Sequence, residues 1–414
     1  MIIKKPELLA PVGSFAALQA AINAGANSVF FGVKQLNMRA RSSYNFELEE
    51  LEEIVARCRP NNVKTYITLN TLLYDHDMNL MQKIVKKAKK VGIDSMIVQD
   101  MAVIEYAKKV GMPLHISTQM SVSNLPSIKF YSKFADTIVL ARELDLKMMK
   151  YICDKVKEEN ICGPAGDLVK IEVFIHGALC IAQSGRCQMS LLQGNASAQR
   201  GACLQECRKA YLVTDIETGK QMQINNDYVL SPKDLCALPF LDKIINTGVS
   251  ILKIEGRGRT ADYVHVVTSI YREAIEAIAE NKFDKVKIKK WMERLKTVYN
   301  RGFCEGYYLG QALPDFTKGY SGNISTEEKT FVGLINHYFD KAKVAEINLQ
   351  AYGLKKGEKI VIIGNTTGVI YEKIEKIMID EKFIDEVKHP NLITIPISKK
   401  VRKNDKVYIL KKRN

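Results

Sequence analysis

The chain has 414 residues, which is long for one domain and sufficient for two domains with a large core. No run of 18 or more apolar residues occurs, so we expect no membrane-spanning helix. Lysine and arginine number 61 against 46 acidic residues, a formal charge of +15. This excess favours a polyanionic partner, although a lysine-rich source organism would produce the same surplus.

Up to about residue 280, short apolar runs alternate with stretches of helical period. We expect helices between the apolar runs, for example at 14–25, 46–58, 78–92 and 144–159. Gly25, Gly92 and Gly248 each stand where a helix should end before the next strand, as a glycine following a helix commonly does. The predicted strands cover residues 7–12, 28–33, 65–70, 95–100, 114–119, 137–142, 170–177 and 250–257.

Eight strands, each followed by a helix, are the pattern of a (β/α)8 barrel. An open doubly wound sheet shares the alternation, but it more often carries a glycine-rich phosphate loop after its first strand. The corresponding turn here, APVGS, lacks GxGxxG. The predicted fold class is therefore α/β, a TIM-like barrel over residues 1–285.

Many of the predicted strands end in polar residues, where a barrel builds its active site. Any single one of them could merely satisfy a neighbouring polar group. As a ring they indicate a site at the C-terminal mouth of the barrel. The ring comprises Asn70, Gln99, Asp100, Ser117, Gln119, Arg142, Glu143, Glu172, His176, Lys253, Glu255 and Arg257.

Four of the nine cysteines fall in one 28-residue stretch, at positions 180, 187, 203 and 207. Loops rich in glycine, serine and glutamine offer little apolar interior, so a metal site is favoured there over buried thiols. Zinc and iron–sulfur clusters both use four thiolates. Paired C-x-x-C knuckles are missing from the sequence, and the loose spacing C-x6-C, 15 residues, C-x3-C favours a bulkier iron–sulfur cluster.

The other cysteines have different expected roles. Cys58, Cys153 and Cys162 stand alone in or beside helical patterns and are expected to be small buried hydrophobes. Cys236 lies in SPKDLC, where Ser231 is typical of a helix N-cap and Pro232 of a first helical residue. A thiolate in the first turns of that helix could replace Cys207 as the fourth ligand.

The N-terminal residues lack the pattern of a secretory signal, so we expect a cytoplasmic protein without disulfides. The cysteine segment, at about 177–230, should form a long insertion over the barrel mouth. Residues 286–329 are expected to form a helix and then a strap or linker. Residues 330–414 contain six short strand patterns, which predict a small β-barrel. The patterns cover residues 331–339, 341–348, 358–364, 368–379, 391–397 and 405–410.

The C-terminal segment is also basic. Residues 331–414 carry 17 lysines and arginines against 10 acidic residues. Small basic β-barrels frequently bind nucleic acid, so this module is expected to contribute to RNA binding.

A continuous motif, E-x-F-x-x-G-A-x-C-x(4)-G-x-C-x-x-S, runs from Glu172 to Ser190. Together with ELLAPVGS, MRARSSYNF, GACLQECR, SPKDLC, LKIEGRGR and the His389-Pro390 segment, it resembles the signature of peptidase family U32, the collagenase-like proteins. The resemblance covers nearly the whole chain. It departs from the usual family pattern mildly at IEGRGRT, where a lysine-like residue and serine usually follow IEGR.

The resemblance implies an eight-stranded barrel, a small C-terminal β-barrel and a 4Fe-4S cluster. Better-understood relatives are RNA hydroxylases, including prephenate-dependent enzymes that form 5-hydroxyuridine at the tRNA wobble position and a ribosomal cytidine hydroxylase; others hydroxylate a ubiquinone precursor. The implied cluster ligands are Cys180, Cys187, Cys203 and Cys207, with Cys236 as the alternative fourth ligand.

The leading hypothesis is an iron–sulfur RNA hydroxylase acting on tRNA, with prephenate as co-substrate and a related family protein as a partner. Oxygen insertion is redox chemistry that side chains cannot perform alone. Within this hypothesis the predicted catalytic residues are His176, Glu255 and Arg142, and the predicted substrate-binding residues are Lys253, Arg257, Arg259 and Gln119.

Two alternatives remain open at this point. A collagenase-like peptidase would need an activated nucleophile or a metal-bound water, but HExxH and GxSxG are missing, and His115, His176 and His265 are scattered. His176 could also orient the cluster as a neighbour of its ligands. The second alternative is an RNA-binding protein in which the cysteines hold a structural metal.

Overall fold

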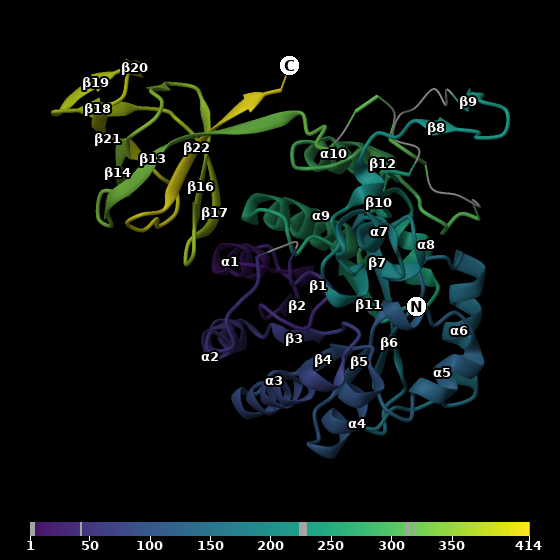
Figure 1. Cartoon of the computed structure of the whole chain (residues 1–414). Helices are drawn as coiled ribbons and strands as arrows, with labels where there is room; N and C mark the ends of the chain where they lie inside the picture. The colour runs from purple at the N-terminus through teal and green to yellow at the C-terminus, as the bar shows by residue number, and fades with distance from the viewer. Residues whose placement is uncertain are drawn as a thin grey trace.

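The computed structural model of the chain describes residues 5–41, 44–222, 230–310, 315–317, 319–320 and 322–413. It consists of a barrel of strands surrounded by helices, with a β domain at its side (Figure 1). Small parts of the MRARSSYNF motif, of the cysteine insertion and of the strap lie outside the described residues. Within the described ranges, no helix combines the length and apolarity needed to cross a membrane.

Eight parallel strands form the barrel, and pairing of the last of them with both the first and the seventh closes it. The predicted (β/α)8 barrel is confirmed, and each predicted strand is found within a few residues of its expected bounds. The strands are β1 (Glu7–Pro11), β2 (Ser28–Gly32), β3 (Lys64–Leu69), β4 (Ser95–Val98), β5 (Leu114–Ile116), β6 (Thr137–Val139), β7 (Lys170–Ala178) and β11 (Ile251–Ile254).

The helices end much as the sequence predicts. Ser14 caps the first helix by accepting a hydrogen bond from the backbone N–H of Ala17, and Gly25 follows that helix with a φ of +82°. The helix predicted from residue 46 begins only at Leu51, because Phe46 instead forms a β-bridge with Val33. The helices around the barrel are α1 (Phe15–Asn23), α2 (Leu51–Cys58), α3 (Met78–Val91), α4 (Met101–Lys109), α5 (Leu125–Tyr131), α6 (Leu146–Glu158), α8 (Leu241–Asn246) and α9 (Ala261–Ala279).

The main apolar core lies between the strands and these helices, and a smaller apolar cluster fills the barrel interior. The interior cluster consists of Leu9, Phe30, Tyr66, Ile97 and Ile251. His115, Glu172 and Lys253 are also buried, on strands that line the barrel. The barrel is therefore polar as well as apolar inside, and its charged groups need partners there.

The cysteine insertion follows β7 and contains short 3₁₀ turns, α7 (Met189–Gly194) and the hairpin of β8 (Val213–Thr214) and β9 (Gln221–Met222). The chain then forms β10 (Asp234–Cys236), which pairs antiparallel with the end of β7. The predicted helix start at Ser231 is therefore wrong. The free edge of β7 offers ladder hydrogen bonds to this segment, and these outcompete the local capping signals.

Residues 285–310 lie against the barrel. Helix α10 (Lys285–Lys296) contacts α9 through the hydrogen bond from Trp291 to Glu273, and β12 (Phe303–Cys304) pairs with β10. The Tyr308 hydroxyl donates to the carbonyl of Phe174, 2.5 Å away, so the described part of the predicted strap is bound to the barrel wall.

The C-terminal part is an antiparallel β domain around its own core. Its two end strands are not paired with each other in the described residues, so the predicted small barrel is open along one side. One predicted strand, at 368–379, is two strands. The main sheet contains β13 (Glu327–Phe339), β14 (Val344–Leu349), β16 (Lys359–Gly364), β17 (Gly368–Lys373), β18 (Ile377–Ile379), β19 (Lys382–Ile384), β21 (Asn391–Pro396) and β22 (Lys406–Lys412), and β15 (Leu354–Lys355) pairs with β20 (Glu386–Val387).

The hairpin of β16 and β17 docks this domain on α1 and α9 (Figure 1). Val361 and Val369 of the hairpin belong to the main core, and the Asn23 side chain donates to the carbonyl of Thr367. The Lys329 and Asp262 side chains form a further ion pair across the junction. The basic β domain is thus packed against one flank of the barrel.

Candidate functional site

A cavity of about 210 Å³ lies at the C-terminal ends of the barrel strands, beneath the cysteine insertion. Phe30, Ile97 and Phe174 contribute apolar surface to it. Asn70 and Gln119 line it from two neighbouring loops, and the Asn70 amide nitrogen donates to the Gln119 amide oxygen over 3.1 Å. Residues of the cysteine insertion and residues of the polar ring thus line the same cavity at the mouth of the barrel.

All four clustered cysteines, at positions 180, 187, 203 and 207, line this one cavity as free thiols. Burial raises the pKa of the Cys207 thiol to about 11, while Arg208 lowers it and the other three cysteines raise it further. Each of the other three thiols is therefore within electrostatic reach of Cys207. Among the described residues, no three cysteine, histidine or acidic side chains are close enough to share a single metal ion.

The donor set nevertheless fits an iron–sulfur cluster in type and place. A 4Fe-4S cluster binds each cysteine through a different iron, so its four sulfur ligands are spaced more widely than the ligands of one ion. Thiolate is the ligand that such clusters require. The cavity brings four of these donors to one opening of the barrel.

Cys236 lies elsewhere, because β10 replaces the predicted helix. Its side chain is buried, with its sulfur 3.9 Å from the Tyr271 hydroxyl and 3.8 Å from the Met292 sulfur. Burial raises the pKa of this thiol to about 12. The structure therefore separates Cys236 from the four clustered thiols.

His176 is likewise absent from the cavity lining, contrary to its predicted catalytic role. Lys253 pairs with Phe174 but the next residue, Ile254, pairs with His176, so Ile175 forms a bulge in β7. The bulge turns His176 out of the barrel, where its ring contacts Tyr263, Tyr271 and Phe303. Burial lowers its pKa to about 3, so the imidazole is neutral.

Lys253 extends into the barrel and meets a buried acid. Its ammonium lies 2.7 Å from Glu172 Oε1, and His115 Nδ1 lies 3.1 Å from Glu172 Oε2. The ammonium also lies 4.4 Å from the centre of the Phe30 ring. Burial alone would raise the pKa of Glu172, but Lys253 and His115 outweigh it and lower the pKa to about 2. The lysine therefore presents a fixed cation at the cavity floor.

Glu255 is surrounded by cations at the end of β11. Arg39 Nη2 lies 3.2 Å from its Oε1. Burial alone would raise the pKa of Glu255, but the positive charges outweigh burial and lower it. These charges are Arg39, Arg257, Arg142 and Lys253. Arg257 donates to Asn37 and Thr68 over 3.0 and 2.8 Å, and burial lowers its pKa to about 10. The predicted residues Glu255, Arg257 and Arg142 all line the cavity.

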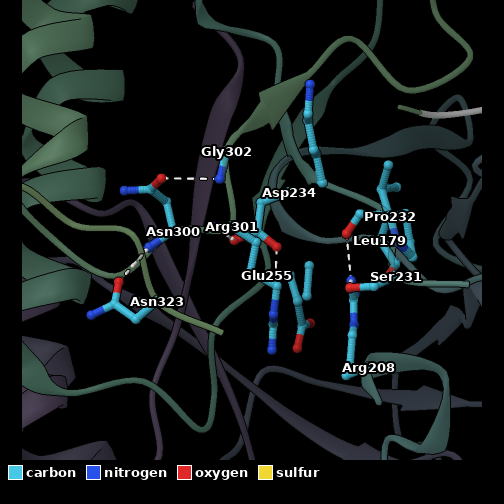
Figure 2. A network of polar contacts seen from close by, with 12 residues as sticks. Leu179, Arg208, Ser231, Pro232, Asp234, Glu255, Asn300, Arg301, Gly302 and Asn323 are labelled. Atoms are coloured by element: carbon cyan, nitrogen blue, oxygen red, sulfur yellow. Dashed lines mark hydrogen bonds and ion pairs between the residues drawn. The ribbon is translucent and has the colours of Figure 1, made fainter. Parts of the chain in front are cut away.

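Further arginines come from the insertion and the strap. Arg301 Nη1 lies 3.3 Å from Asp234 Oδ1, and Arg208 donates to the Ser231 hydroxyl and to the carbonyls of Leu179 and Pro232. Figure 2 shows Arg208 beside Leu179, Ser231 and Pro232, and Arg301 beside Asp234. Arg259 lies with its guanidinium carbon 3.4 Å from the centre of the Tyr299 ring.

Seven basic and two acidic side chains line the described cavity, so it attracts anions. Three of the arginines, at 142, 257 and 301, have a buried Nε without a hydrogen-bond partner among the described residues. The basic residues are Arg39, Arg142, Arg208, Lys253, Arg257, Arg259 and Arg301, and the acidic residues are Glu206 and Glu255.

Sequence reasoning missed Arg39, Arg208 and Arg301 as site residues. Arg39 and Arg208 lie in two of the motifs, MRARSSYNF and GACLQECR, so their motif membership was the available signal. Arg301 lies in the strap, and only the path of the chain after α10 brings it to the mouth.

Comparison with known proteins matches residues 13–317 to "Peptidase family U32". A "Collagenase" of Porphyromonas gingivalis is 46% identical over 98% of both chains. The "tRNA hydroxylation protein P1" of Bacillus subtilis is 31% identical, over 97% of this chain and 94% of that protein. The "23S rRNA 5-hydroxycytidine C2501 synthase" of Escherichia coli is 35% identical, over 67% of this chain and 40% of that protein. The solved structure of the U32 peptidase Mk0906 aligns with a TM-score of 0.39 and 10% identity, over 61% of this chain and 93% of that chain.

Proposed function

The chain belongs to peptidase family U32, and we propose that it is an iron–sulfur RNA hydroxylase, forming 5-hydroxyuridine at the wobble position of tRNA with prephenate as co-substrate. The observation that carries the proposal is the cavity at the barrel mouth, which combines four thiols with seven basic side chains. RNA-hydroxylating names among relatives that are 31–35% identical support it.

The chemistry explains why a cofactor is needed. Replacing the hydrogen on C5 of a pyrimidine by a hydroxyl group oxidises the base by two electrons, so an oxygen donor must be reduced in the same turnover. A cluster held by Cys180, Cys187, Cys203 and Cys207 would supply electron transfer, which side chains alone cannot provide.

The protein's own residues bind and orient the reactants. The target base must leave its stack before it can enter the cavity. Phe30 and Phe174 then offer apolar surface to the ring, while the amides of Asn70 and Gln119 can hydrogen-bond to its polar edge. This arrangement suits an unpaired base in an anticodon loop.

Prephenate is a dicarboxylate, and the fixed cations of the cavity floor suit it. Lys253 and Arg257 are buried there, the first held by Glu172 and the second by Asn37 and Thr68. Neither residue has to reorganise when a carboxylate binds, which strengthens the interaction.

Peptide hydrolysis is the second candidate, because a relative that is 46% identical is named a collagenase. A histidine base is missing from the described cavity lining, and His176 lies behind the barrel wall. Incubation of the purified full-length protein with gelatin tests this candidate, and cleavage that persists in a Cys203→Ala variant would favour it.

The test of the main proposal is deletion of the gene followed by mass spectrometry of tRNA and rRNA nucleosides. We expect the loss of 5-hydroxyuridine or its derivatives from tRNA, with restoration by the wild-type gene and not by C203A. Cys58→Ala is the matched control, because Cys58 is a buried residue at the end of α2 and does not line the cavity. Unchanged hydroxypyrimidine levels in the deletion strain would contradict the proposal.

A further inference from the structure

Three arginines from distant segments meet on one wall of the cavity. Arg208 lies within the cysteine insertion, Arg259 follows β11, and Arg301 follows α10. Arg208 and Arg259 are half-buried, whereas Lys253 and Arg257 are buried at the floor. We call the three residues Arg208, Arg259 and Arg301 the outer arginines.

The outer arginines are held mainly by neutral groups. Arg208 donates to a hydroxyl and two backbone carbonyls, and the Tyr299 ring lies 3.4 Å from the Arg259 guanidinium carbon and 5.2 Å from that of Arg301. Within the described residues, the carboxylate that forms an ion pair with one of these arginines is Asp234, which lies 3.3 Å from Arg301. Their orientation is therefore fixed while most of their charge stays unneutralised.

Such an arrangement is costly without an anion. Arg259 and Arg301 lie against the same Tyr299 ring, with guanidinium carbons 3.4 Å and 5.2 Å from its centre, so two like charges are held close together. Arg301 is only 6% exposed, and its Nε has no hydrogen-bond partner in the described part of the chain. Buried cations are normally paired, so two like charges held side by side at a cavity wall indicate that a ligand completes the site.

The geometry points to a phosphate subsite: the outer arginines bind one phosphodiester of the substrate RNA, adjacent to the nucleotide whose base enters the cavity. This inference rests on the proposed function and adds a specific contact to it. Planar guanidinium groups match the oxygens of a phosphodiester. A phosphate at the half-buried wall also leaves the buried cations of the floor for the small co-substrate.

A carboxylate of prephenate is the other anion that these arginines could bind, and the experiment separates the two sources. In one arm, the full-length protein is titrated with an anticodon stem-loop RNA carrying an unmodified wobble uridine, and fluorescence anisotropy gives Kd. Single linkages around that uridine are replaced in turn by neutral methylphosphonates. In the other arm, isothermal titration calorimetry measures prephenate binding.

We expect one neutral linkage to weaken binding to the wild-type protein on the order of tenfold, as for the loss of a charge-assisted contact. Arg301→Gln should weaken binding to the unmodified RNA by a similar factor and reduce the slope of log Kd against log salt by about one. In R301Q the same neutral linkage should have no further effect, because the two changes remove one contact.

Arg301 is buried against Asp234, so replacing it can also affect folding. Arg259→Gln is therefore the second variant, because Arg259 is half-buried and forms no ion pair with a carboxylate in the described residues. Arg294→Gln is the matched control, since it removes the same charge from an exposed position on α10 and should change Kd less than about twofold. Thermal unfolding checks that each variant is folded.

Three results would overturn the inference. The first is that no single neutral linkage weakens RNA binding to the wild-type protein. The second is that the neutral linkage weakens RNA binding by the same factor in R301Q and R259Q as in wild type. The third is that the arginine variants lose prephenate binding but keep RNA binding. The proposed function is tested separately by nucleoside analysis. If the arginines and the phosphate prove to be coupled but the deletion strain keeps its hydroxypyrimidines, the proposed hydroxylase function is contradicted and the phosphate subsite is not.

Discussion

Replacing Glu172 by glutamine tests the charge arrangement of the cavity floor. The carboxylate of Glu172 is fully buried, with Lys253 on one oxygen and His115 on the other. Its pKa of about 2, against an ordinary 4.5, corresponds to about 3 kcal/mol of stability at neutral pH. Removing one partner of a buried pair costs a similar amount, about 3–5 kcal/mol, because the other charge stays buried and unpaired.

We therefore expect E172Q to be less stable than wild type by about 3 kcal/mol at pH 7, which lowers Tm by roughly 5 °C. Circular dichroism of thermal unfolding measures this difference. The double variant E172Q/K253M should recover at least half of the loss, because it removes the stranded ammonium and fills the same space with an apolar chain. Lys253→Met alone provides the remaining corner of the cycle.

The pH dependence provides a second check. The pKa of Glu172 is lower in the folded chain than in the unfolded chain, so its contribution is complete above about pH 4.5 and is lost as the pH falls towards 2. The Tm gap between wild type and E172Q should therefore narrow between about pH 5 and pH 3. An E172Q protein as stable as wild type at pH 7, or a double variant no more stable than E172Q, would refute the reasoning.

Three further experiments test the site. Cys203→Ala should abolish the absorbance near 400 nm expected of an anaerobically purified iron–sulfur protein, and Cys236→Ala should retain it; equal spectra would contradict the separation of these thiols. Gly177→Ala should lower Tm more than Gly166→Ala. Both glycines have a positive φ, but of the two only Gly177 would place a Cβ 2.4 Å from a backbone oxygen. Equal losses of Tm would show that backbone strain, and not this close contact, determines the destabilisation. His176→Asn should lower Tm and leave the pH dependence of product formation unchanged between about pH 6 and 8, since the imidazole is already neutral there; loss of a pH limb would restore a catalytic role.

The barrel was predictable because its signals are local and repeated. Apolar runs mark the strands, and Gly25 and Gly92 end helices with the positive φ that their positions require. The polar ring was predictable for the same reason, because strand ends of a parallel barrel meet at one mouth. Its members Glu255, Arg257 and Lys253 do line the cavity.

The errors arose where tertiary pairing overrode a local signal. Ser231 and Pro232 are typical of a helix start, yet the segment after them pairs with β7, which places Cys236 in the protein interior. The sequence of that segment alone does not indicate that the end of β7, some 55 residues earlier in the chain, has an edge free to pair with it. Arg301 was missed for a related reason, since its position depends on the path of the strap.

The bulge at Ile175 explains why His176 lies outside the cavity, and it also shapes the site. His176 stands at the same parity as Glu172 and Phe174, so simple alternation places all three inside the barrel, but the extra residue turns His176 outward. Gly177 follows with a φ of +103°, and its missing Cβ lets the backbone approach the carbonyl of Glu255. The end of β7 can then pair with both β11 and β10, and Cys180 emerges at the mouth three residues later. The irregularity that removes a histidine from the cavity is thus the one that directs the cysteine insertion over it.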